Sequence, residues 1–465
     1  MIPLTLREIA TAASGEVVPS QFSDAIVDAD VVTDSREVGA GSLYVARMGE
    51  HADGHDFVDN AIAAGATASL VSRVVSEAPS VVVADVQEAF AALAREVYDR
   101  CLAAGGLRTV GITGSSGKTS TKDLMAHVIQ NLGVTLAPIA SYNSEVGVPL
   151  TVSRLTEQTA YLVAEMGASG VGHIEYLTRI APPQIGVVLN VGTAHLGEFG
   201  SREAIAHTKA ELVRALPDDG LAVLNADDDV VLAMADQTSA RVITVGLSET
   251  ADIRATNVRL NGKGQASFTM HFRHESPIEV ALSLHGEHHV GNALSVAAVA
   301  QEWGMPVAEI AEHLASASAG SRWRMQVTER ADGVTIVNDA YNANPDSMRA
   351  ALRALASMRG QGRAIAVIGE MRELGEQSQA EHEAIGEQAA GLGLDLVLSI
   401  GQGARGAAQK FDDLGGASHE VDDVAEAKAF LVDQLQPGDV VLLKSSRDSG
   451  LRLLGDDLAQ GEVAP

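Results

Sequence analysis

The chain has a single cysteine, no long apolar run and comparatively few basic residues. Because Cys101 has no second cysteine to pair with, no disulfide can form within the chain, and a reducing compartment suits it. No stretch of about 18 apolar residues occurs, and the first residues lack a basic start followed by an apolar core. We therefore expect no membrane insertion and a soluble, cytoplasmic protein.

Positive charge is scarce along the whole chain. Lys and Arg number 33 against 61 Asp and Glu, which gives a formal net charge of -28. Such an excess disfavours a broad electrostatic contact with nucleic acid or anionic lipid. A polyanionic ligand therefore requires a local cluster of basic groups.

The length of 465 residues predicts two to four domains, and we expect three: residues 1–105, 106–321 and 322–465. The 45 glycines and 13 prolines are spread along the chain without a low-complexity tract, which argues against disorder. In the first domain, short apolar runs precede an alanine-rich helical stretch over residues 86–104, and this pattern is typical of a small α/β domain. Gly105 and Gly106 form a plausible hinge after it.

The other two expected domains alternate strands with helices, so the predicted fold class is α/β. The pattern predicts a mostly parallel central sheet with strands at residues 107–112, 161–164, 185–191 and 221–224, closed by short strands over 252–284 and an apolar helix at 290–303. The pattern also predicts a third, doubly wound domain with strands at residues 334–337, 364–368, 394–400 and 439–443.

A phosphate-binding loop is predicted between the first central strand and the helix after it, whose spacing suggests an end at Gly133. Residues 111–119 read Gly-Ile-Thr-Gly-Ser-Ser-Gly-Lys-Thr. Backbone N–H groups and the start of a helix attract phosphate oxygens, a lysine adds a full positive charge, and a threonine hydroxyl is a ligand for Mg²⁺. The common pattern has glycine at position 112, where this chain has Ile112, so the loop is a variant. We expect ATP to contact Gly114, Ser115, Ser116, Gly117, Lys118, Thr119 and Ser120.

The loop with its Gly-Lys-Thr-Ser-Thr run resembles that of the Mur ligase family, and the likeness covers nearly the whole chain. Residues 33–36 (Thr-Asp-Ser-Arg) and 49–57 (Gly-Glu-His-Ala-Asp-Gly-His-Asp-Phe) look like the family segments for the uridine nucleotide. Residues 339–347, 369–375 and 443–447 are similar to the member that adds D-alanyl-D-alanine. The Asp-Asn-Pro-Arg run usual in the sister ligase that adds the diamino acid is absent.

This resemblance implies a three-domain enzyme with a central P-loop-type parallel sheet and a doubly wound C-terminal domain. The implied activity is ATP-dependent and Mg²⁺-dependent joining of D-alanyl-D-alanine to UDP-N-acetylmuramoyl-tripeptide in peptidoglycan synthesis, through an acyl phosphate and with ADP and phosphate as products. We expect a monomer with no nucleic-acid partner.

The resemblance also assigns roles to individual residues. Lys118 is expected to act on the phosphates, with Thr119 at the nucleotide's metal and Glu165, His195 and Lys209 at a second Mg²⁺, where the lysine is converted to a carbamate by carbon dioxide. Carbamate formation needs the neutral amine, so the site must lower the lysine pKa from about 10.4. Read alone, Glu165 and His195 are ordinary loop residues and Lys209 an exposed helix lysine.

Three further groups of residues match family positions for ligands. The nucleoside is assigned to Asn292, Arg324 and Asp339, although the family commonly has glycine and aspartate where this chain has Trp323 and Asn338. The substrate residues are Ser35, Arg36, Asn143, Ser144, Tyr341, Asn342, Asn344, Ser446 and Arg447. A second asparagine is common where Ser144 stands, and Arg447 is suited to hold the dipeptide carboxylate.

Two alternative readings remain at this point. One is a related amide ligase, adding a diamino acid to the muramoyl dipeptide or acting as a folylpolyglutamate-type enzyme. The other is an ATP-dependent binding or regulatory protein on the same scaffold. The intact set of Lys118, Thr119, Glu165, His195 and Lys209 disfavours the second, because a pure binder needs no second metal.

Overall fold

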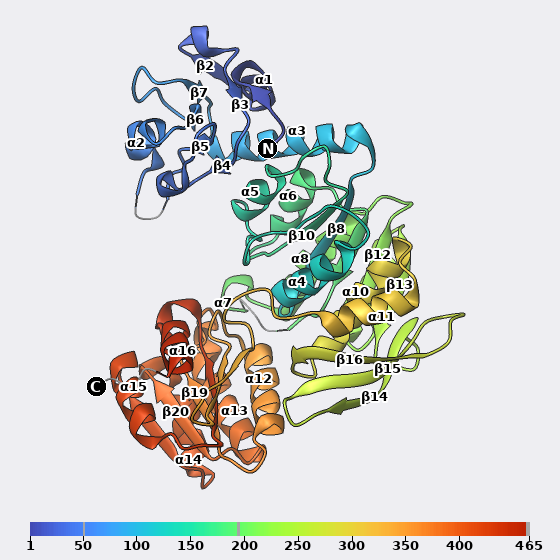
Figure 1. Cartoon of the computed structure of the whole chain (residues 1–465), viewed down its shortest axis with the longest axis vertical. Helices are drawn as coiled ribbons and strands as arrows, with labels where there is room; N and C mark the ends of the chain where they lie inside the picture. Colours follow the sequence, from blue (N-terminus) through green and yellow to red (C-terminus); the bar gives the residue numbers. More distant parts are fainter. Residues whose placement is uncertain (50–51, 193–195, 462–465) are drawn as a thin grey trace.

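The computed structural model of the chain contains three main β-sheets, which follow one another along its long axis (Figure 1). The structure describes residues 1–49, 52–192 and 196–461. Within these ranges the sheets have five, nine and six strands, and a separate pair joins β1 (Leu4–Thr5) to β3 (Ile26–Val27). Helices alternate with the strands of each sheet, so the predicted α/β class is confirmed.

The first sheet combines four parallel strands with one antiparallel edge strand. Its order is β2 (Glu16–Val18), β7 (Ser80–Val82), β6 (Ala68–Val71), β5 (Leu43–Val45) and β4 (Val31–Val32). Its helices are α1 (Leu6–Ala12) and α2 (Val58–Ala63), with 3-10 turns η1 (Ser20–Phe22), η2 (Ser35–Glu37) and η3 (Gly54–Phe57). Thr5 and Glu8 form a capping box at the start of α1. The bonds that the Thr5 N–H, the Thr5 hydroxyl and Arg100 donate to the Glu8 carboxylate lower the pKa of Glu8 to about 2.

The long helix α3 (Val86–Gly105) connects the first sheet to the central one (Figure 1). Asp85 caps its start, and it ends at Gly105 and Gly106, whose φ angles of +122° and +107° favour glycine. The helix packs against α1 on one side of the junction and against central-sheet helices on the other. Its buried Tyr98 hydroxyl lies 3.1 Å from Thr109 Oγ1 and donates to the Pro182 carbonyl at 2.6 Å.

The central sheet has a parallel part and an antiparallel extension. Its order is β16 (Ile278–His285), β15 (Gln265–His271), β14 (Ile253–Leu260), β13 (Arg241–Gly246), β12 (Leu221–Asn225), β11 (Ile185–Val188), β8 (Arg108–Thr113), β10 (Tyr161–Glu165) and β9 (Thr135–Leu136). The strands from β9 to β14 pair in parallel, and β14, β15 and β16 are antiparallel. The expected parallel sheet and its closing strands are therefore both present.

Helices cover both faces of this sheet. One face packs against α4 (Lys118–Ile129), α10 (His289–Glu302) and α11 (Val307–Ser316). The other packs against α5 (Gly147–Val152), α6 (His173–Ile180) and α8 (Arg202–Arg214). The remaining short elements are α7 (Leu196–Phe199), α9 (Asp229–Leu232) and η4 (Ala233–Gln237). Because β8, β10 and β11 are parallel, the residues after them meet at one edge of the sheet.

The third sheet is doubly wound, as the sequence predicts. Its order is β17 (Gln326–Glu329), β18 (Thr335–Asn338), β22 (Val440–Lys444), β19 (Ala364–Ile368), β20 (Leu396–Ile400) and β21 (Ser418–Val421), with only β17 antiparallel. One face packs against α12 (Pro345–Met358), α13 (Ser378–Gly391) and α14 (Arg405–Asp413), the other against α15 (Val424–Gln434) and α16 (Leu451–Gln460). Short turns η5 (Gly375–Gln377), η6 (Gln402–Ala404) and η7 (Arg447–Ser449) complete it.

The third sheet also contacts the central part through two glycines. In α7 the Gly197 N–H donates to the Glu373 carbonyl at 3.0 Å. A Cβ on Gly197 would lie 2.9 Å from that carbonyl oxygen, and one on Gly375 would lie 3.4 Å from the Gly197 Cα.

None of the helices in the described ranges is both long and apolar enough to cross a membrane.

Tyr98 offers a test of the junction between α3 and the central sheet. We expect Tyr98→Phe to lower the free energy of unfolding by about 1–2 kcal/mol, because Pro182 loses a buried donor. Leu102→Ala, at a 40% exposed position of the same helix, is the matched control and should cost less than about 0.5 kcal/mol. Urea denaturation followed by circular dichroism measures both free energies. Equal denaturation midpoints for the two variants would show that the Tyr98 hydroxyl does not stabilise this junction.

Candidate active site

The phosphate loop lies between β8 and α4, at the edge where β8, β10 and β11 end. Ile112 is fully buried within β8, so this loop begins two residues later than the common pattern, at Gly114. A Cβ on Gly114 would lie 2.9 Å from Leu189 Cβ. Gly117 has a φ of +80°, and its Cβ would lie 3.1 Å from Asn292 Oδ1. Both glycines therefore allow a turn that a side chain would obstruct.

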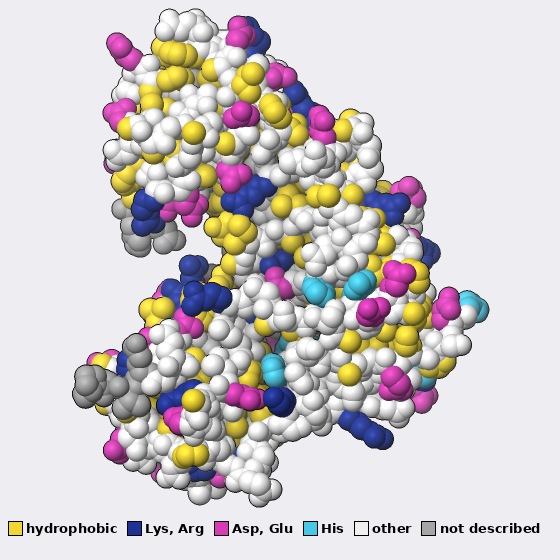
Figure 2. All heavy atoms as spheres, in the orientation of Figure 1, with side chains coloured by type: hydrophobic (Ala, Val, Ile, Leu, Met, Phe, Trp, Pro, Cys, Tyr) yellow, Lys and Arg dark blue, Asp and Glu magenta, His cyan; other side chains and the backbone are white. Residues whose placement is uncertain are grey.

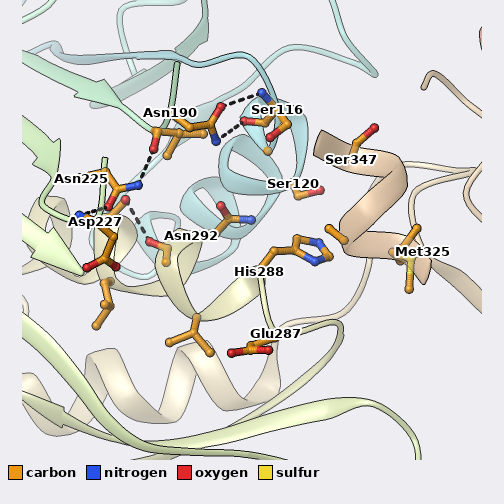
Figure 3. A pocket seen from close by; sticks show the side chains of 18 of the residues that line it. Ser116, Ser120, Asn190, Asn225, Asp227, Glu287, His288, Asn292, Met325 and Ser347 are labelled. Atoms are coloured by element: carbon orange, nitrogen blue, oxygen red, sulfur yellow. Dashed lines mark hydrogen bonds between the residues drawn. The ribbon is translucent and has the colours of Figure 1, made fainter. Parts of the chain in front are cut away.

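Asn190, just after β11, holds the loop in place. Its Oδ1 accepts from the backbone N–H groups of Ser115 and Ser116 at 2.9 Å each. Its Nδ2 donates to the Ser116 carbonyl at 3.2 Å, and Figure 3 shows the two contacts with Ser116. The Gly192 N–H donates to Ser115 Oγ at 2.9 Å. Two of the loop's donors thus already have a neutral acceptor. The sequence interpretation did not single out Asn190 for this contact.

Lys118 and Glu165 bring opposite charges to the two sides of the loop's base. The Lys118 ammonium group donates to the Gly114 carbonyl at 2.7 Å. Burial lowers the pKa of Lys118, the nearby Glu165 carboxylate opposes that shift, and Arg324 adds to it. An ammonium group held this way is placed to exchange its carbonyl acceptor for phosphate oxygens.

Glu165 is the last residue of β10 and is completely buried. Its Oε1 accepts from Asn143 Nδ2 at 2.6 Å and from Thr119 Oγ1 at 3.2 Å. Its Oε2 is buried without any hydrogen-bond partner. A carboxylate oxygen left in this state is costly unless a cation or a donor completes the site.

Lys209 is buried on α8, with 6% of its surface exposed. Burial, followed by the charge of Lys118, lowers the pKa of Lys209 to about 7. The alternative reading of Lys209 as an ordinary exposed helix lysine does not agree with this burial. His195 lies outside the described residues. Within those ranges no group of three or more His, Cys, Asp and Glu side chains is placed to hold a metal ion.

Arg324 links the third sheet to the loop. Its Nη2 donates to Thr119 Oγ1 at 3.2 Å and to Ser141 Oγ at 3.0 Å. Its guanidinium carbon lies 4.3 Å from the centre of the Tyr341 ring, and that of Arg447 lies 5.9 Å from the same ring. Two cations and one aromatic face therefore converge beside the hydroxyl of Thr119.

The neighbouring departures from the family pattern have a physical explanation. Trp323 has a φ of +60°, in the region that favours glycine. Its indole N–H donates to Asp456 Oδ2 at 2.9 Å, and two arginines lie over its ring. Asn338 Nδ2 donates to Asp456 Oδ1 at 3.2 Å and to the Arg452 carbonyl at 2.9 Å. An aspartate at 338 would instead place a second carboxylate against Asp456.

One cavity of about 410 Å³ extends from the loop toward α10 and α12 (Figure 3). The expected nucleotide residues Ser116, Gly117, Ser120, Asn292, Arg324 and Asp339 all line it. Asp339 accepts from the Met325 N–H at 3.0 Å and pairs with Lys444 Nζ at 2.6 Å, so it is firmly held. The lining also includes Asn225, Asp227 and His288, which sequence reasoning missed as functional candidates.

A second cavity of about 510 Å³ lies between the loop and the third sheet. Its lining contains the expected residues Ser115, Ser116, Gly117, Lys118, Thr119, Asn143, Glu165, Arg324, Tyr341, Asn342, Asn344, Ser446 and Arg447. Asn344 donates to the Ser115 carbonyl at 3.3 Å and also caps α12. Ser446 Oγ accepts from the N–H of Arg372, a further cation of the lining that the sequence interpretation did not name. In a strongly acidic chain, four basic side chains meet at this one cavity.

Three of the expected substrate residues lie away from both cavities' linings. Ser144 Oγ accepts from the N–H groups of Val146 and Gly147 at 3.4 Å, just before α5. Ser35 and Arg36 belong to η2 beside the first sheet, where Arg36 pairs with Asp34 at 2.6 Å. Figure 2 shows a hollow between the part built on the first sheet and the part built on the third, with basic side chains on both rims.

The motif at residues 49–57 contains a buried histidine, His55, whose ring nitrogens both form hydrogen bonds within the fold. His55 Nδ1 lies 2.6 Å from Asp53 Oδ1, and His55 Nε2 accepts from the Ser72 N–H at 2.9 Å. The ring is therefore held as the tautomer that donates from Nδ1. Within the described part of this motif, His55 anchors the turn to Ser72, the residue that follows strand β6.

A phosphate loop that faces a buried carboxylate, with a third sheet closing one side of the cavity, defines a nucleotide-binding α/β enzyme. Comparison with known proteins gives its family. Residues 30–100 match the model described as Mur ligase family, catalytic domain; residues 112–300 match the Mur ligase middle domain; and residues 323–447 match the Mur ligase, glutamate ligase domain. The chain belongs to the Mur ligase family.

Individual relatives are similar over their full length. The UDP-N-acetylmuramoyl-tripeptide--D-alanyl-D-alanine ligase of Mycobacterium tuberculosis is 46% identical, with 100% of this chain and 99% of the relative covered. The crystal structure of MurF from Acinetobacter baumannii has a TM-score of 0.89 at 31% identity, covering 98% and 99%. The MurF ligase of Thermotoga maritima, solved in complex with ADP, has a TM-score of 0.80 at 31% identity, covering 93% and 97%.

The contact of Asn190 with the loop gives a testable prediction. In Asn190→Asp the side chain still accepts from Ser115 and Ser116, but it cannot donate to the Ser116 carbonyl and its charge repels phosphate. We expect its affinity for ADP to fall about tenfold below that of Asn190→Ala, the neutral control, as measured by calorimetry. If the aspartate variant binds ADP as well as the alanine variant, the side chain does not lie close enough to the phosphates to matter.

Proposed function

We propose that this chain is an ATP-dependent amide ligase that joins D-alanyl-D-alanine to UDP-N-acetylmuramoyl-tripeptide in peptidoglycan synthesis. The observation that carries the proposal is the second cavity, where the phosphate loop, the buried Glu165 and the third-sheet residues Asn344 and Arg447 meet. The full-length similarity to relatives with this name supports it. The alternatives, a diamino-acid-adding or folylpolyglutamate-type ligase, are not favoured by these relatives.

ATP is the proposed energy source and is assigned to the loop and to the cavity beside it. Lys118 and the loop N–H groups are suited to the β and γ phosphates, because the ammonium group is buried and donates to the Gly114 carbonyl, which phosphate oxygens can replace as its acceptor. The nucleoside is assigned to Asn292, Arg324 and Asp339. The ADP complex of the Thermotoga maritima relative supports nucleotide use.

Mg²⁺ fits the oxygen atoms at the base of the loop. Glu165 offers a buried carboxylate oxygen without a partner, and Thr119 Oγ1 lies beside its other oxygen. Hard cations prefer such oxygen ligands. We assign Thr119 to one ion and Glu165, His195 and carbamylated Lys209 to a second. Bound there, the metal would supply positive charge to the transferring phosphoryl group.

The carbamate assignment has support from the burial of Lys209. Because burial and Lys118 lower its pKa to about 7, the neutral amine that reacts with carbon dioxide is well populated near neutral pH. Conversion to the carbamate also replaces a buried positive charge near Lys118 with a negative one. This change reverses the repulsion between the two lysines into attraction.

The remaining substrates are assigned by position. Ser35 and Arg36 would contact the uridine nucleotide, Asn143 and Ser144 the muramoyl peptide, and the dipeptide would meet Tyr341, Asn342, Asn344, Ser446 and Arg447. With the division into residues 1–105, 106–321 and 322–465, the uridine nucleotide is assigned mainly to the first domain, ATP mainly to the second and the dipeptide to the third, while Arg324 and Asp339 bring the third domain to the nucleoside as well. We further propose that the enzyme acts as a cytoplasmic monomer.

The proposed reaction has two displacements. The terminal carboxylate of the tripeptide attacks the γ phosphorus, the bond to the bridging oxygen breaks, and ADP leaves with that electron pair. The neutral amine of D-alanyl-D-alanine then attacks the acyl carbon and expels phosphate, and the amine loses a proton. Activation is required because an unmodified carboxylate oxygen is a poor leaving group. Exclusion of water between the sheets would protect the acyl phosphate from hydrolysis.

Isotope transfer tests this reaction directly. With heavy oxygen in the terminal carboxylate of the tripeptide, we expect label in inorganic phosphate, because that oxygen leaves with the phosphoryl group. Mass spectrometry of the products provides the measurement. Label in AMP together with pyrophosphate release would establish adenylation and overturn the proposal. Phosphate release with single amino acids but not with D-alanyl-D-alanine would support the alternative ligases.

Chemical rescue tests the carbamate. Lys209→Ala should lose ligation and regain part of it with short carboxylic acids, which fill the vacated space and return oxygen ligands. Lys118→Ala is the matched control: it should stay inactive with the same acids, because an acid cannot replace its positive charge. An active Lys209→Arg variant combined with no rescue would mean that Lys209 works as a plain cation.

A further inference from the structure

Lys122 is a buried cation that the proposed reaction does not use. It lies on α4, one helical turn after Lys118, and only 2% of its surface is exposed. Its ammonium group pairs with the carboxylate of the neighbouring Asp123 and donates to the Pro138 carbonyl at 3.0 Å. An apolar pair of similar volume is often at least as stable as a buried ion pair, so a chain that keeps one calls for a reason other than stability.

Pro138 begins a segment, residues 138–143, that follows β9 and reaches the base of the phosphate loop. Pro138 itself is buried, whereas Ile139 is 59% exposed. Ala140 has a φ of +50°, in the left-handed region that a residue with a Cβ rarely adopts. Such a conformation persists only where contacts on both sides hold the chain in place. The bond from Lys122 to Pro138 is the contact on the near side.

Ser141 and Asn143 make the contacts on the far side. Asn143 Nδ2 donates to Glu165 Oε1 at 2.6 Å. Ser141 Oγ lies 2.9 Å from Thr119 Oγ1. Because the single hydroxyl proton of Thr119 is donated to Glu165, Ser141 must be the donor in its contact with Thr119. The lone pairs of Ser141 Oγ are then left for Arg324, whose Nη2 donates to this oxygen at 3.0 Å.

Asp123, the partner of Lys122, contacts the chain that leads to Arg324. A Cβ on Gly320 would lie 3.1 Å from Asp123 Cγ, so glycine lets the connection between α11 and the third sheet pass close to this carboxylate. Arg324 follows four residues later and donates to Thr119 Oγ1 at 3.2 Å. The two segments that meet at Thr119 therefore both run past the Lys122–Asp123 pair.

We propose that Lys122 is a positioning residue that holds residues 138–143 so that Ser141 and Arg324 meet at the hydroxyl of Thr119. In the part of the chain that the structure describes, the linings of both cavities at the loop leave Lys122 out, so it acts through Ser141 and not by contact with a substrate. The inference rests on the proposed ligation, in which Thr119 is assigned to the metal of the nucleotide. A pair that merely fills space would be replaceable by neutral side chains of similar shape.

A neutral pair tests this role in the full chain. Lys122→Met with Asp123→Asn removes both charges and the donor to Pro138 while keeping the volume nearly unchanged. We expect kcat for phosphate release in the complete reaction to fall about tenfold, because the segment no longer fixes Ser141. The affinity for ADP, measured by calorimetry, should stay within about twofold of wild type, since Lys118 and the loop N–H groups are unchanged.

A double-mutant cycle tests whether Lys122 acts through Ser141. Ser141→Ala is made in the wild-type chain and in the neutral-pair variant, and kcat is compared among the four proteins. If the segment transmits the effect, Ser141→Ala lowers kcat in the wild-type chain and lowers it little further in the variant. Lys122→Arg, which keeps a charged donor for Pro138, should retain part of the activity that the neutral pair loses. The more exposed pair of Lys428 and Asp457 is the matched control: Lys428→Met with Asp457→Asn should keep the wild-type kcat.

The opposite results overturn the proposal. Unchanged kcat in the folded neutral-pair variant would mean that the pair only fills space, and additive losses in the cycle would mean that Lys122 does not act through Ser141. A loss of ADP affinity as large as the loss of kcat would indicate a distorted loop. If the neutral pair prevents folding, Lys122→Gln carries the same cycle, because it keeps a polar group beside Asp123 but is one atom shorter on the side facing Pro138. A wild-type chain that releases no phosphate with D-alanyl-D-alanine would refute the proposed function itself, separately from the role of Lys122.

Discussion

The buried carboxylate of Glu165 is the constraint around which the site is arranged. It lies at the end of a central parallel strand, is completely buried, and has one oxygen without a partner. Thr119 and Asn143 donate to its other oxygen, and the positive charge of Lys118 in the loop interacts favourably with the carboxylate. A carboxylate in this position is tolerable only beside cations or donors, so the loop, the Asn143 segment and Arg324 gather around it.

The distribution of charge follows from the same constraint. The chain as a whole is strongly acidic, yet Lys118, Arg324, Arg372 and Arg447 line one cavity. Concentrating basic groups there creates a local field that attracts phosphates and carboxylates, while the acidic remainder of the surface repels other polyanions. The aromatic ring of Tyr341 has two of these guanidinium groups close to it, because its face attracts positive charge.

Local patterns in the sequence predicted much of this architecture. The strands at 107–112, 161–164 and 364–368 and the phosphate loop were predicted within a residue or two, since buried parallel strands are continuous apolar runs. The helix after the loop ends at Ile129, not at Gly133. Leu132 keeps the periodic spacing because the following turn also packs on the core, which periodicity alone cannot distinguish from helix.

What the sequence could not give were contacts between distant segments. Short or mixed strands such as β9 and β13 have no clear apolar pattern, and they are fixed by pairing with their neighbours. Asn190 meets the loop, and Trp323 tolerates its backbone, through partners more than 70 residues away. The bonds that Ser144 accepts at the start of α5 are likewise a contact that no sequence pattern indicated.

The close approach of Gly197 and Gly375 has a mechanical consequence. With no side chain on either residue, backbone touches backbone between α7 and the turn before α13, and one hydrogen bond joins them. Because only backbone atoms meet here, rotation of side chains cannot let the two segments slide past each other. A rigid-body shift of the third sheet would therefore either carry α7 with it or break the hydrogen bond. A shift of the third sheet therefore cannot be absorbed at this contact by side-chain rearrangement alone.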